Sequence, residues 1–219
     1  MMILVAACGR QLVDDDPLVD ASVQGDGDSL DAAPNAPNAP PDGAALDGRG
    51  PLSCSTEVSG RWLAFVTADV FRGDVASNLG LRAVDGVCAE LAAGAGWSGS
   101  FKAFVNGEDG SGGDRIRAIA VAGGHDGWYR VDGTKVFDRA LKSALQPLSV
   151  TERCTLVTDD VGAWTGSPTP SETHDCAGWT SSAVTGRYGD PTGIGEAWEF
   201  AGVGSCAVLR HLYCFQVSD

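Results

Sequence analysis

The chain has 219 residues, enough for one domain of ordinary size and a tail. Hydrophobic residues make up 43% of it, which allows a real core, whereas 30 glycines and a charged fraction of only 20% are typical of a loop-rich protein with β-structure. The net charge of −14, without a basic block, argues against nucleic acid and heparin-like polyanions as partners. The simplest interpretation of the acidity is solubility.

Seven cysteines indicate an oxidising compartment. The odd one, Cys8, ends the tetrapeptide Val-Ala-Ala-Cys, which resembles a bacterial lipobox, where a signal peptidase cuts before the cysteine and lipid is attached to its sulfur. The segment before Cys8 is short for a signal peptide and contains no Lys or Arg, so either the true start lies upstream or the match is chance. We expect residues 1–8 to be a signal-peptide remnant and Cys8 to carry the lipid.

Residues 9–53 are predicted to form a disordered spacer rich in Ala, Pro and Asp. They include a short Asn-Ala-Pro repeat within residues 31–43, and no aromatic residue occurs between Cys8 and Trp62. Such a segment cannot bury enough apolar surface to offset the entropy of ordering it. No apolar run reaches the roughly 18–20 residues of a membrane span, so membrane attachment is expected only through the lipid. The folded domain is predicted to occupy residues 54–219.

The first half of this domain is predicted to open with a strand and a helix. Residues 61–67 are aromatic and β-branched, as in a strand. The next pattern predicts a helix that ends at Gly94 or Gly96 and directs Cys88 at the core. Its apolar face consists of Leu81, Val84, Cys88 and Leu91. A strand over 101–105 follows.

The remaining elements are shorter and less regular. A flexible loop is expected over 106–114, and residues 115–120 fit either a strand or a short helix. Residues 128–137 predict a hairpin around an Asp-Gly turn, and Asp138 is expected to cap a second helix through Ser143. A strand is expected over 162–166, and the segment from Cys176 to Cys214 supplies the last strands. Mixed strands with two helices predict the α+β class and a mixed antiparallel sheet.

The order of these segments resembles the endostatin-like branch of the C-type lectin-like fold. It is most similar to bacterial surface lipoprotein domains that include the leptospiral endostatin-like proteins, and the resemblance covers about residues 58–217. Its best motifs are Trp164-Thr165-Gly166, the run from Cys176 to Trp179-Thr180-Ser181, and Leu212-Tyr213-Cys214. The implied fold is one C-type lectin-like domain.

The resemblance also implies a nested disulfide pattern. In that pattern the helix cysteine pairs with the last-strand cysteine, here Cys88 with Cys214, and the two inner cysteines pair with each other, here Cys176 with Cys206. Cys54 and Cys154 are then left to form a third bond, although neither position belongs to the shared pattern.

Metal and catalytic motifs are weak in this chain. The Glu-Pro-Asn or Gln-Pro-Asp and Trp-Asn-Asp triplets of calcium-dependent lectins do not occur, and Trp179 is followed by hydroxyl residues, which are poor ligands for a hard cation. Two acidic loops are better interpreted as solvated turns than as calcium sites; they contain Glu108, Asp109 and Asp114, and Asp159 and Asp160. The three histidines, His125, His174 and His211, are scattered and predict neither zinc nor a catalytic triad. We therefore expect no metal, no cofactor and no catalytic residue.

The tryptophans provide the candidate ligand contacts. Trp62, Trp164 and Trp198 lie in strand patterns and are predicted to be core residues. Trp97, Trp128 and Trp179 lie beside glycines at loop edges, where one or two of them could be exposed and anchor a ligand, although core packing is favoured for each taken singly. Any binding surface is expected between residues 155 and 205.

These patterns together predict a non-enzymatic binding module on a secreted or outer-membrane lipoprotein. The ligand would be an extracellular protein or glycan, and the protein is expected to be a monomer. Two alternatives stay open: an extracellular enzyme, for instance a redox enzyme that uses unpaired thiols, and a structural envelope protein.

Overall fold

The computed structural model describes residues 52–54, 61–76, 79–106, 114–116, 125–166 and 174–218. All of them belong to one compact unit, Ala45–Asp219. Cys8 and the predicted spacer up to residue 51 lie outside the described residues, as do Glu108 and Asp109.

The described β-structure forms a single mixed sheet. The strands are β1 (Trp62–Val66), β2 (Ser100–Ala103), β3 (Gly127–Tyr129), β4 (Lys135–Asp138), β5 (Ala163–Trp164), β6 (Thr185–Gly189), β7 (Gly202–Ser205) and β8 (His211–Ser218). Their order is β4-β3-β1-β8-β5-β6-β7, and β2 also pairs with β8.

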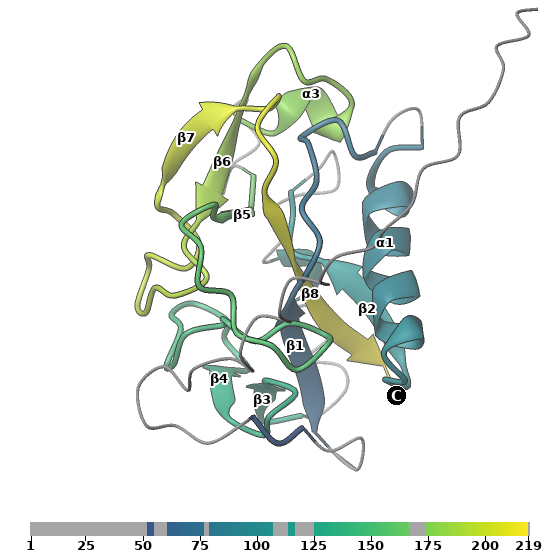
Figure 1. Ribbon diagram of the computed structural model, residues 1–219, viewed down its shortest axis with the longest axis vertical. Coiled ribbons are helices and arrows are strands. Elements are labelled where there is room, and N and C mark those ends of the chain that lie inside the picture. Colours follow the sequence, from purple (N-terminus) through teal and green to yellow (C-terminus); the bar gives the residue numbers. More distant parts are fainter. Residues whose placement is uncertain are drawn as a thin grey trace, which may run out of the picture. The chain divides into compact units, whose positions relative to one another are not determined.

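Strand β8 joins the two halves of this sheet. It runs antiparallel to β1 and β2, both of which reach Cys214, and parallel to β5, where Leu212 pairs with Trp164. Figure 1 shows β8 in yellow crossing the centre of the domain, with β1 and β2 beside it and β5 near its beginning. The last strand of the chain is therefore the central one.

Both faces of the sheet are covered around β1 and β8, which explains why these strands are continuous apolar runs. In β1, Trp62, Ala64 and Val66 belong to one core cluster, whereas Leu63 and Phe65 belong to a second cluster on the opposite face. All five residues are buried. The strand predicted over 61–67 is confirmed.

Helix α1 (Leu81–Gly94) covers the face that carries the second cluster. Val84, Cys88 and Ala92 recur every four residues and are buried, while Leu81 and Leu91 pack at the edge of the same cluster. The helix packs against β2 and β8 (Figure 1). The predicted helix and the inward direction of Cys88 are confirmed.

The predicted hairpin is also confirmed. β3 and β4 are antiparallel, and Gly133 in the connecting turn has φ 86°, a value that suits glycine. Arg130 Nε donates to Asp132 Oδ1 at 3.1 Å, and the backbone N–H of Thr134 donates to the same carboxylate oxygen at 3.1 Å. Burial alone would raise the pKa of Asp132, but these hydrogen bonds and the Arg130 charge outweigh it and lower that pKa.

The second helix expected over Asp138–Ser143 is wrong. Leu141 adopts φ 47°, outside the right-handed helical region, and the N–H of Ala144 donates to the carbonyl of Gly195 in a β-bridge. The segment uses its backbone groups to hold the 190–200 loop instead of forming a helix. The helix of the second half is α3 (Cys176–Trp179), a single turn with positive φ at Ala177 and Gly178.

Other assignments are partial. Residues 114–116 form a helical turn, and 117–120 lie outside the described residues. The strand expected over 101–105 is β2, and the one expected over 162–166 is the two-residue β5. The coarse expectation of mixed helices and strands is confirmed.

Three disulfides tie the domain together. They join Cys88 to Cys214, Cys176 to Cys206, and Cys54 to Cys154, which are the pairs expected above. The Cys176–Cys206 loop is nested inside the Cys88–Cys214 loop. The Cys54–Cys154 loop instead overlaps the Cys88–Cys214 loop in part, because Cys88 lies inside the first loop and Cys214 lies outside it.

The two nested bonds should differ in their contribution to stability. Their sequence separations are 126 and 30 residues, and in the loop-entropy model such loops stabilise by roughly 5 and about 3.5 kcal/mol respectively. We expect C88A/C214A to lower the free energy of unfolding in urea by more than C176A/C206A does, by about 1 kcal/mol. A larger loss in C176A/C206A would contradict this account.

Two glycines offer opposite effects of an added methyl group. A Cβ on Gly86, inside α1, would meet no atom within 4 Å, so Gly86→Ala should raise the free energy of unfolding by about 0.5–1 kcal/mol through helix propensity. A Cβ on Gly186 would lie 2.6 Å from Cys176 Sγ, so Gly186→Ala should lower it. Thermal unfolding of both variants beside the wild type checks the two signs.

Candidate functional site

The three tryptophans named as candidate ligand contacts are all buried, so none of them is an exposed anchor, and each has the core-packing role that was favoured for it singly. Trp97 is 7% exposed, and Trp128 and Trp179 are 0% exposed. Each indole N–H donates to a backbone carbonyl, at distances of 3.0, 2.9 and 2.7 Å respectively. The three acceptors are the carbonyls of Glu152, Gln216 and Asn106. These tryptophans are part of the framework, as are the predicted core residues Trp62, Trp164 and Trp198.

The glycines near these tryptophans differ in their surroundings. A Cβ on Gly127 would lie 2.0 Å from the carbonyl oxygen of Phe137, so glycine lets the backbones of β3 and β4 come close there. Gly96 and Gly178, which precede Trp97 and Trp179, have positive φ, and an added Cβ would meet no atom within 4 Å. Close packing on the Trp179 ring comes instead from Gly166, where a Cβ would lie 2.9 Å from Cζ2 of Trp179.

The histidines do not gather into one site. His125 stacks on Trp62 with ring centroids 4.1 Å apart, and His174 Nδ1 lies 3.1 Å from Thr185 Oγ1. Asp114 is exposed at the start of the helical turn 114–116. Among the residues that the structure describes, no group of three or more His, Cys, Asp or Glu side chains could hold a metal ion.

A cavity of about 330 Å³ opens between the 158–162 segment, the end of β6 and the loop that follows it. We call it the acidic pocket. It is lined by Thr158, Asp159, Asp160, Gly162, Tyr188, Gly189, Asp190, Thr192 and Ala201. The lining thus includes three residues with carboxylates and three with hydroxyls, and every lining residue falls within the 155–205 range expected from the sequence.

One wall of the acidic pocket is attached to the beginning of β8. The backbone N–H of His211 donates to the Gly162 carbonyl at 3.0 Å, and His211 Nε2 lies 3.2 Å from Asp159 Oδ1. Arg210 Nη1 donates to the Val161 carbonyl. The sequence of β8 therefore fixes the position of the 158–162 segment.

The opposite wall is the turn after β6. Asp190 Oδ1 accepts hydrogen bonds from the backbone N–H and the hydroxyl of Thr192, at 2.8 and 2.7 Å, so this carboxylate closes its own turn. The Asp190 N–H donates to the Ala197 carbonyl at 3.0 Å. A Cβ on Gly189 would lie 1.7 Å from the carbonyl oxygen of Trp198, so only glycine fits beneath this loop.

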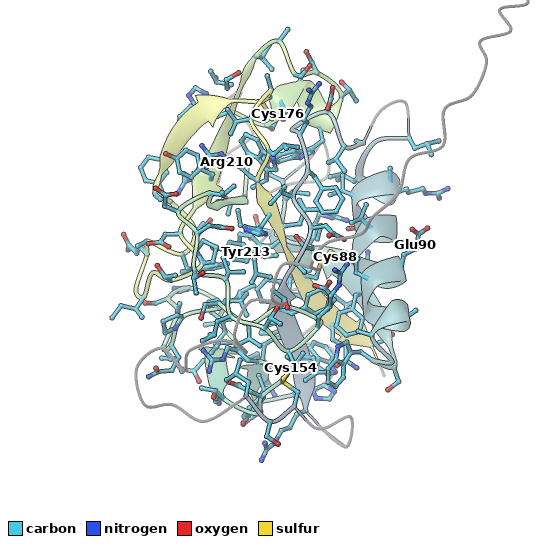
Figure 2. The ribbon with its side chains drawn as sticks, in the orientation of Figure 1. Cys88, Glu90, Cys154, Cys176, Arg210 and Tyr213 are labelled. Carbon is cyan, nitrogen blue, oxygen red and sulfur yellow. A yellow bond between two sulfur atoms is a disulfide. The ribbon has the colours of Figure 1, made fainter. Side chains whose placement is uncertain are left out.

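Arg210 supports the aromatic wall from behind (labelled in Figure 2). Its guanidinium carbon lies 3.4 Å from the centroid of the Tyr188 ring and 5.2 Å from that of Trp164. Arg210 is only 9% exposed, and this burial lowers its pKa. Guanidinium still keeps its charge at neutral pH, so Tyr188 is held by a buried cation.

Both nitrogens of the His211 ring are engaged. Nδ1 lies 2.7 Å from the Thr67 carbonyl oxygen, which can only accept, so Nδ1 carries a hydrogen. Nε2 faces the Asp159 carboxylate. His211 is 2% exposed, so its ring nitrogens contact other protein groups and are not open to a ligand in the pocket.

The acidic pocket has an excess of negative charge. Of the ion pairs in the described part of the chain, the His211–Asp159 pair is the one that involves a pocket carboxylate. Asp159 and Asp160 are exposed, and Asp190 is partly buried. The site can therefore attract and hydrogen-bond a group that carries positive charge or several hydroxyls.

Sequence reasoning found part of this site. It singled out Asp159 and Asp160, though only as a solvated turn, and it located the region. It missed Tyr188, Asp190 and Arg210, which have no motif of their own. The Asp190-Pro191-Thr192-Gly193 turn pattern was the one available signal for that wall.

No protein-family model matches the chain, and no curated protein sequence matches it. Within the described residues, no helix is both long enough and apolar enough to cross a membrane.

Tyr213 lies in the first core cluster and should make the stability of the protein fall at high pH. Its hydroxyl is fully buried without a hydrogen-bond partner among the described residues, and burial, assisted by the charge of Asp190, raises its pKa well above the usual value of about 10. The unfolded chain loses this proton near pH 10 while the folded chain keeps it, so stability falls as pH rises above 10.

We expect Tyr213→Phe to abolish this loss, which for one such group is about 1.4 kcal/mol at pH 11. Urea unfolding of the wild type, Tyr213→Phe and the partly exposed control Tyr129→Phe at pH 8 and pH 11 provides the measurement. An equal pH effect in the wild type and Tyr213→Phe would contradict the assignment.

Proposed function

We propose that the protein is a non-enzymatic binding module of a cell-envelope lipoprotein, attached through lipid on Cys8, and that the acidic pocket receives part of an extracellular ligand. The proposal includes the finer fold assignment, a C-type lectin-like domain of the endostatin-like type. The bond between Cys88 of α1 and Cys214 of β8, with Cys176–Cys206 nested inside it, supports this assignment.

The disulfides support a location outside the cytosol. All six cysteines of the described residues are oxidised in pairs, and such bonds persist in secreted and envelope proteins. The same pairing leaves no thiol among these residues for redox catalysis, which favours binding over the enzyme alternative.

The chemistry of the pocket also favours binding. A general base must have a free nitrogen or oxygen within reach of a substrate. His211 uses both ring nitrogens internally, and Asp190 Oδ1 is occupied by its own turn. We therefore assign these groups a structural role in holding the pocket walls and not a role in proton transfer.

The observation that carries the proposal is the excess of carboxylates on a preformed cavity. A cavity of about 330 Å³ lies at the lower end of the usual range for ligand sites. Three carboxylates around one space select a positively charged group, such as a lysine or arginine side chain of a protein ligand. A neutral glycan could bind to the hydroxyls and the Tyr188 ring, but it would give the three carboxylates no positively charged partner.

Binding of a fluorescein-labelled hexalysine peptide to the full chain, measured by fluorescence anisotropy at low salt, tests this prediction. Exposed ion pairs contribute about 0.2–1 kcal/mol each, so the triple variant D159N/D160N/D190N should bind roughly three- to a hundredfold more weakly. Added salt should weaken binding to the wild type.

The matched control removes three acidic charges elsewhere on the domain. E90Q/D126N/D138N changes exposed residues of α1, of the residue before β3, and of β4. Figure 2 shows Glu90 on the outer side of α1, away from Arg210. If this control weakens binding as much as the pocket variant does, net charge alone attracts the peptide and the pocket is not the site. Equal binding of hexaglutamate would also refute the proposal.

A further inference from the structure

The three disulfides differ sharply in their access to solvent. The four sulfur-bearing residues of the Cys88–Cys214 and Cys176–Cys206 bonds are each 0% exposed. The backbone covers the second bond closely: a Cβ on Gly73 would lie 2.1 Å from Cys176 Sγ. Cys54 and Cys154 are partly exposed, and their chain neighbours Ser53, Arg153 and Thr155 are exposed. Only this third bond can meet a dissolved thiol without opening the core.

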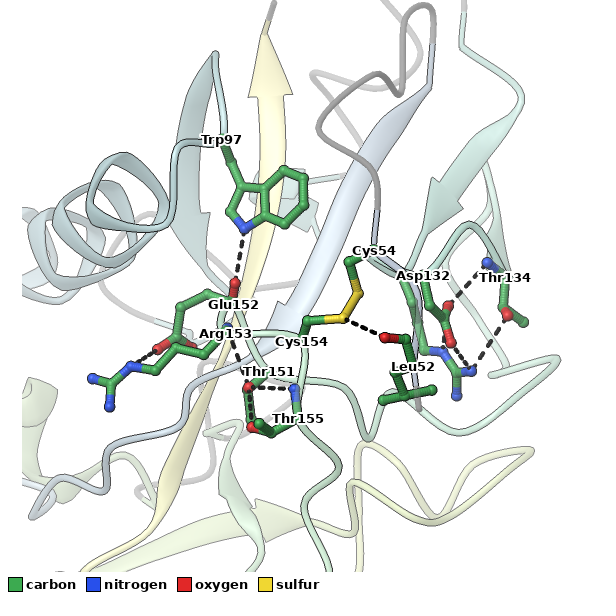
Figure 3. Close-up of a disulfide and its surroundings, with 11 residues drawn as sticks. Leu52, Cys54, Trp97, Asp132, Thr134, Thr151, Glu152, Arg153, Cys154 and Thr155 are labelled. Atoms are coloured by element: carbon green, nitrogen blue, oxygen red, sulfur yellow. Dashed lines mark hydrogen bonds and ion pairs between the residues drawn. A yellow bond between two sulfur atoms is a disulfide. The ribbon is translucent and has the colours of Figure 1, made fainter. Parts of the chain in front are cut away.

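The turn that carries Cys154 is held by many bonds besides the disulfide (Figure 3). Within it, Thr151 N–H donates to the Thr155 carbonyl at 2.9 Å, and the two threonine hydroxyls lie 2.7 Å apart. Trp97 Nε1 donates to the Glu152 carbonyl, and Glu152 Oε2 accepts from the N–H of Ala68. Breaking the disulfide would leave this turn in place.

The segment that carries Cys54 is held much less firmly. In the described part of the chain, no backbone-to-backbone hydrogen bond joins residues 52–54 to the rest of the domain, and the Leu52 carbonyl oxygen contacts Cys154 Sγ at 3.7 Å. Leu52 and Cys54 pack on the edge of the second core cluster, and the disulfide is the covalent link. Opening the bond therefore costs little packing.

We propose that Cys54–Cys154 is a thiol-exchange site, a clasp that an extracellular dithiol reductant opens while the other two disulfides stay intact. A thiolate of the reductant attacks one sulfur of the clasp and forms a mixed disulfide, and its second thiol then displaces the protein sulfur. Two electrons and two protons pass to Cys54 and Cys154, which become thiols, and the reductant becomes a disulfide. Residues 52–54 are then released from the 151–155 turn.

Differential labelling of the full chain tests the selectivity. The oxidised protein is treated with thioredoxin kept reduced by its reductase, free thiols are trapped with N-ethylmaleimide, and the remaining disulfides are then reduced and alkylated with iodoacetamide. Peptide mapping should show N-ethylmaleimide on Cys54 and Cys154 at a rate at least about tenfold above that of the four buried cysteines, because those require local unfolding first. Equal rates at all six cysteines would overturn the proposal.

A second readout tests the release of the segment. Arg61 is exposed directly before β1, and Arg82 is exposed within α1. Trypsin should cut after Arg61 at least about tenfold faster once the clasp is reduced, whereas cutting after Arg82 should not change, because α1 stays folded. C54S/C154S should reproduce the reduced state; if that variant fails to fold, the selectively reduced wild type gives the same comparison. Unchanged cleavage at Arg61 after selective reduction would show that the disulfide does not restrain this segment, which would overturn the proposal.

Discussion

The bond between Cys88 and Cys214 connects the one long helix of the described residues to the strand on which the sheet depends. β8 pairs with β1, β2 and β5, so it is the only element of the described sheet that touches both of its halves. Because both faces of β8 are buried, seven consecutive residues of this strand are shielded from water. The last strand must therefore be in place before the two halves of the sheet can form one unit.

This dependence extends to the acidic pocket. The residues at the start of β8 do not line the pocket, yet they hold its walls: His211 binds the 158–162 segment, and Arg210 stacks behind Tyr188. The charged groups of the pocket are thus supported by a buried cation and a buried imidazole. A rigid site with exposed carboxylates and internal supports is suited to recognition, because the supports are already ordered before a ligand arrives.

Two of the three disulfides are buried and maintain the fold. The third is accessible and ties residues 52–54 to the 151–155 turn. Burial removes the first two from reagents, and loop closure over 126 residues makes the Cys88–Cys214 bond a large contributor to stability. The Cys54–Cys154 bond lies outside the hydrogen-bonded sheet, so its opening changes how the chain enters the domain and leaves the core unchanged. The proposed binding at the acidic pocket and the proposed opening of the Cys54–Cys154 bond therefore involve separate parts of one domain.

What the sequence by itself determined was local. Apolar patterns placed β1 and α1, and an Asp-Gly turn placed the β3–β4 hairpin, because each of these signals depends on a few neighbouring residues. The resemblance supplied two of the cysteine pairs and left the third by elimination. Tertiary structure decided the rest. The segment after Asp138 bonds to Gly195 and so is not a helix. Trp97, Trp128 and Trp179 are buried because each indole packs in the core and donates to a backbone carbonyl of a segment distant in sequence. The pocket combines residues from 158 to 201 with supports at 210 and 211, and only the pairing of β5, β6 and β8 brings those distant positions together.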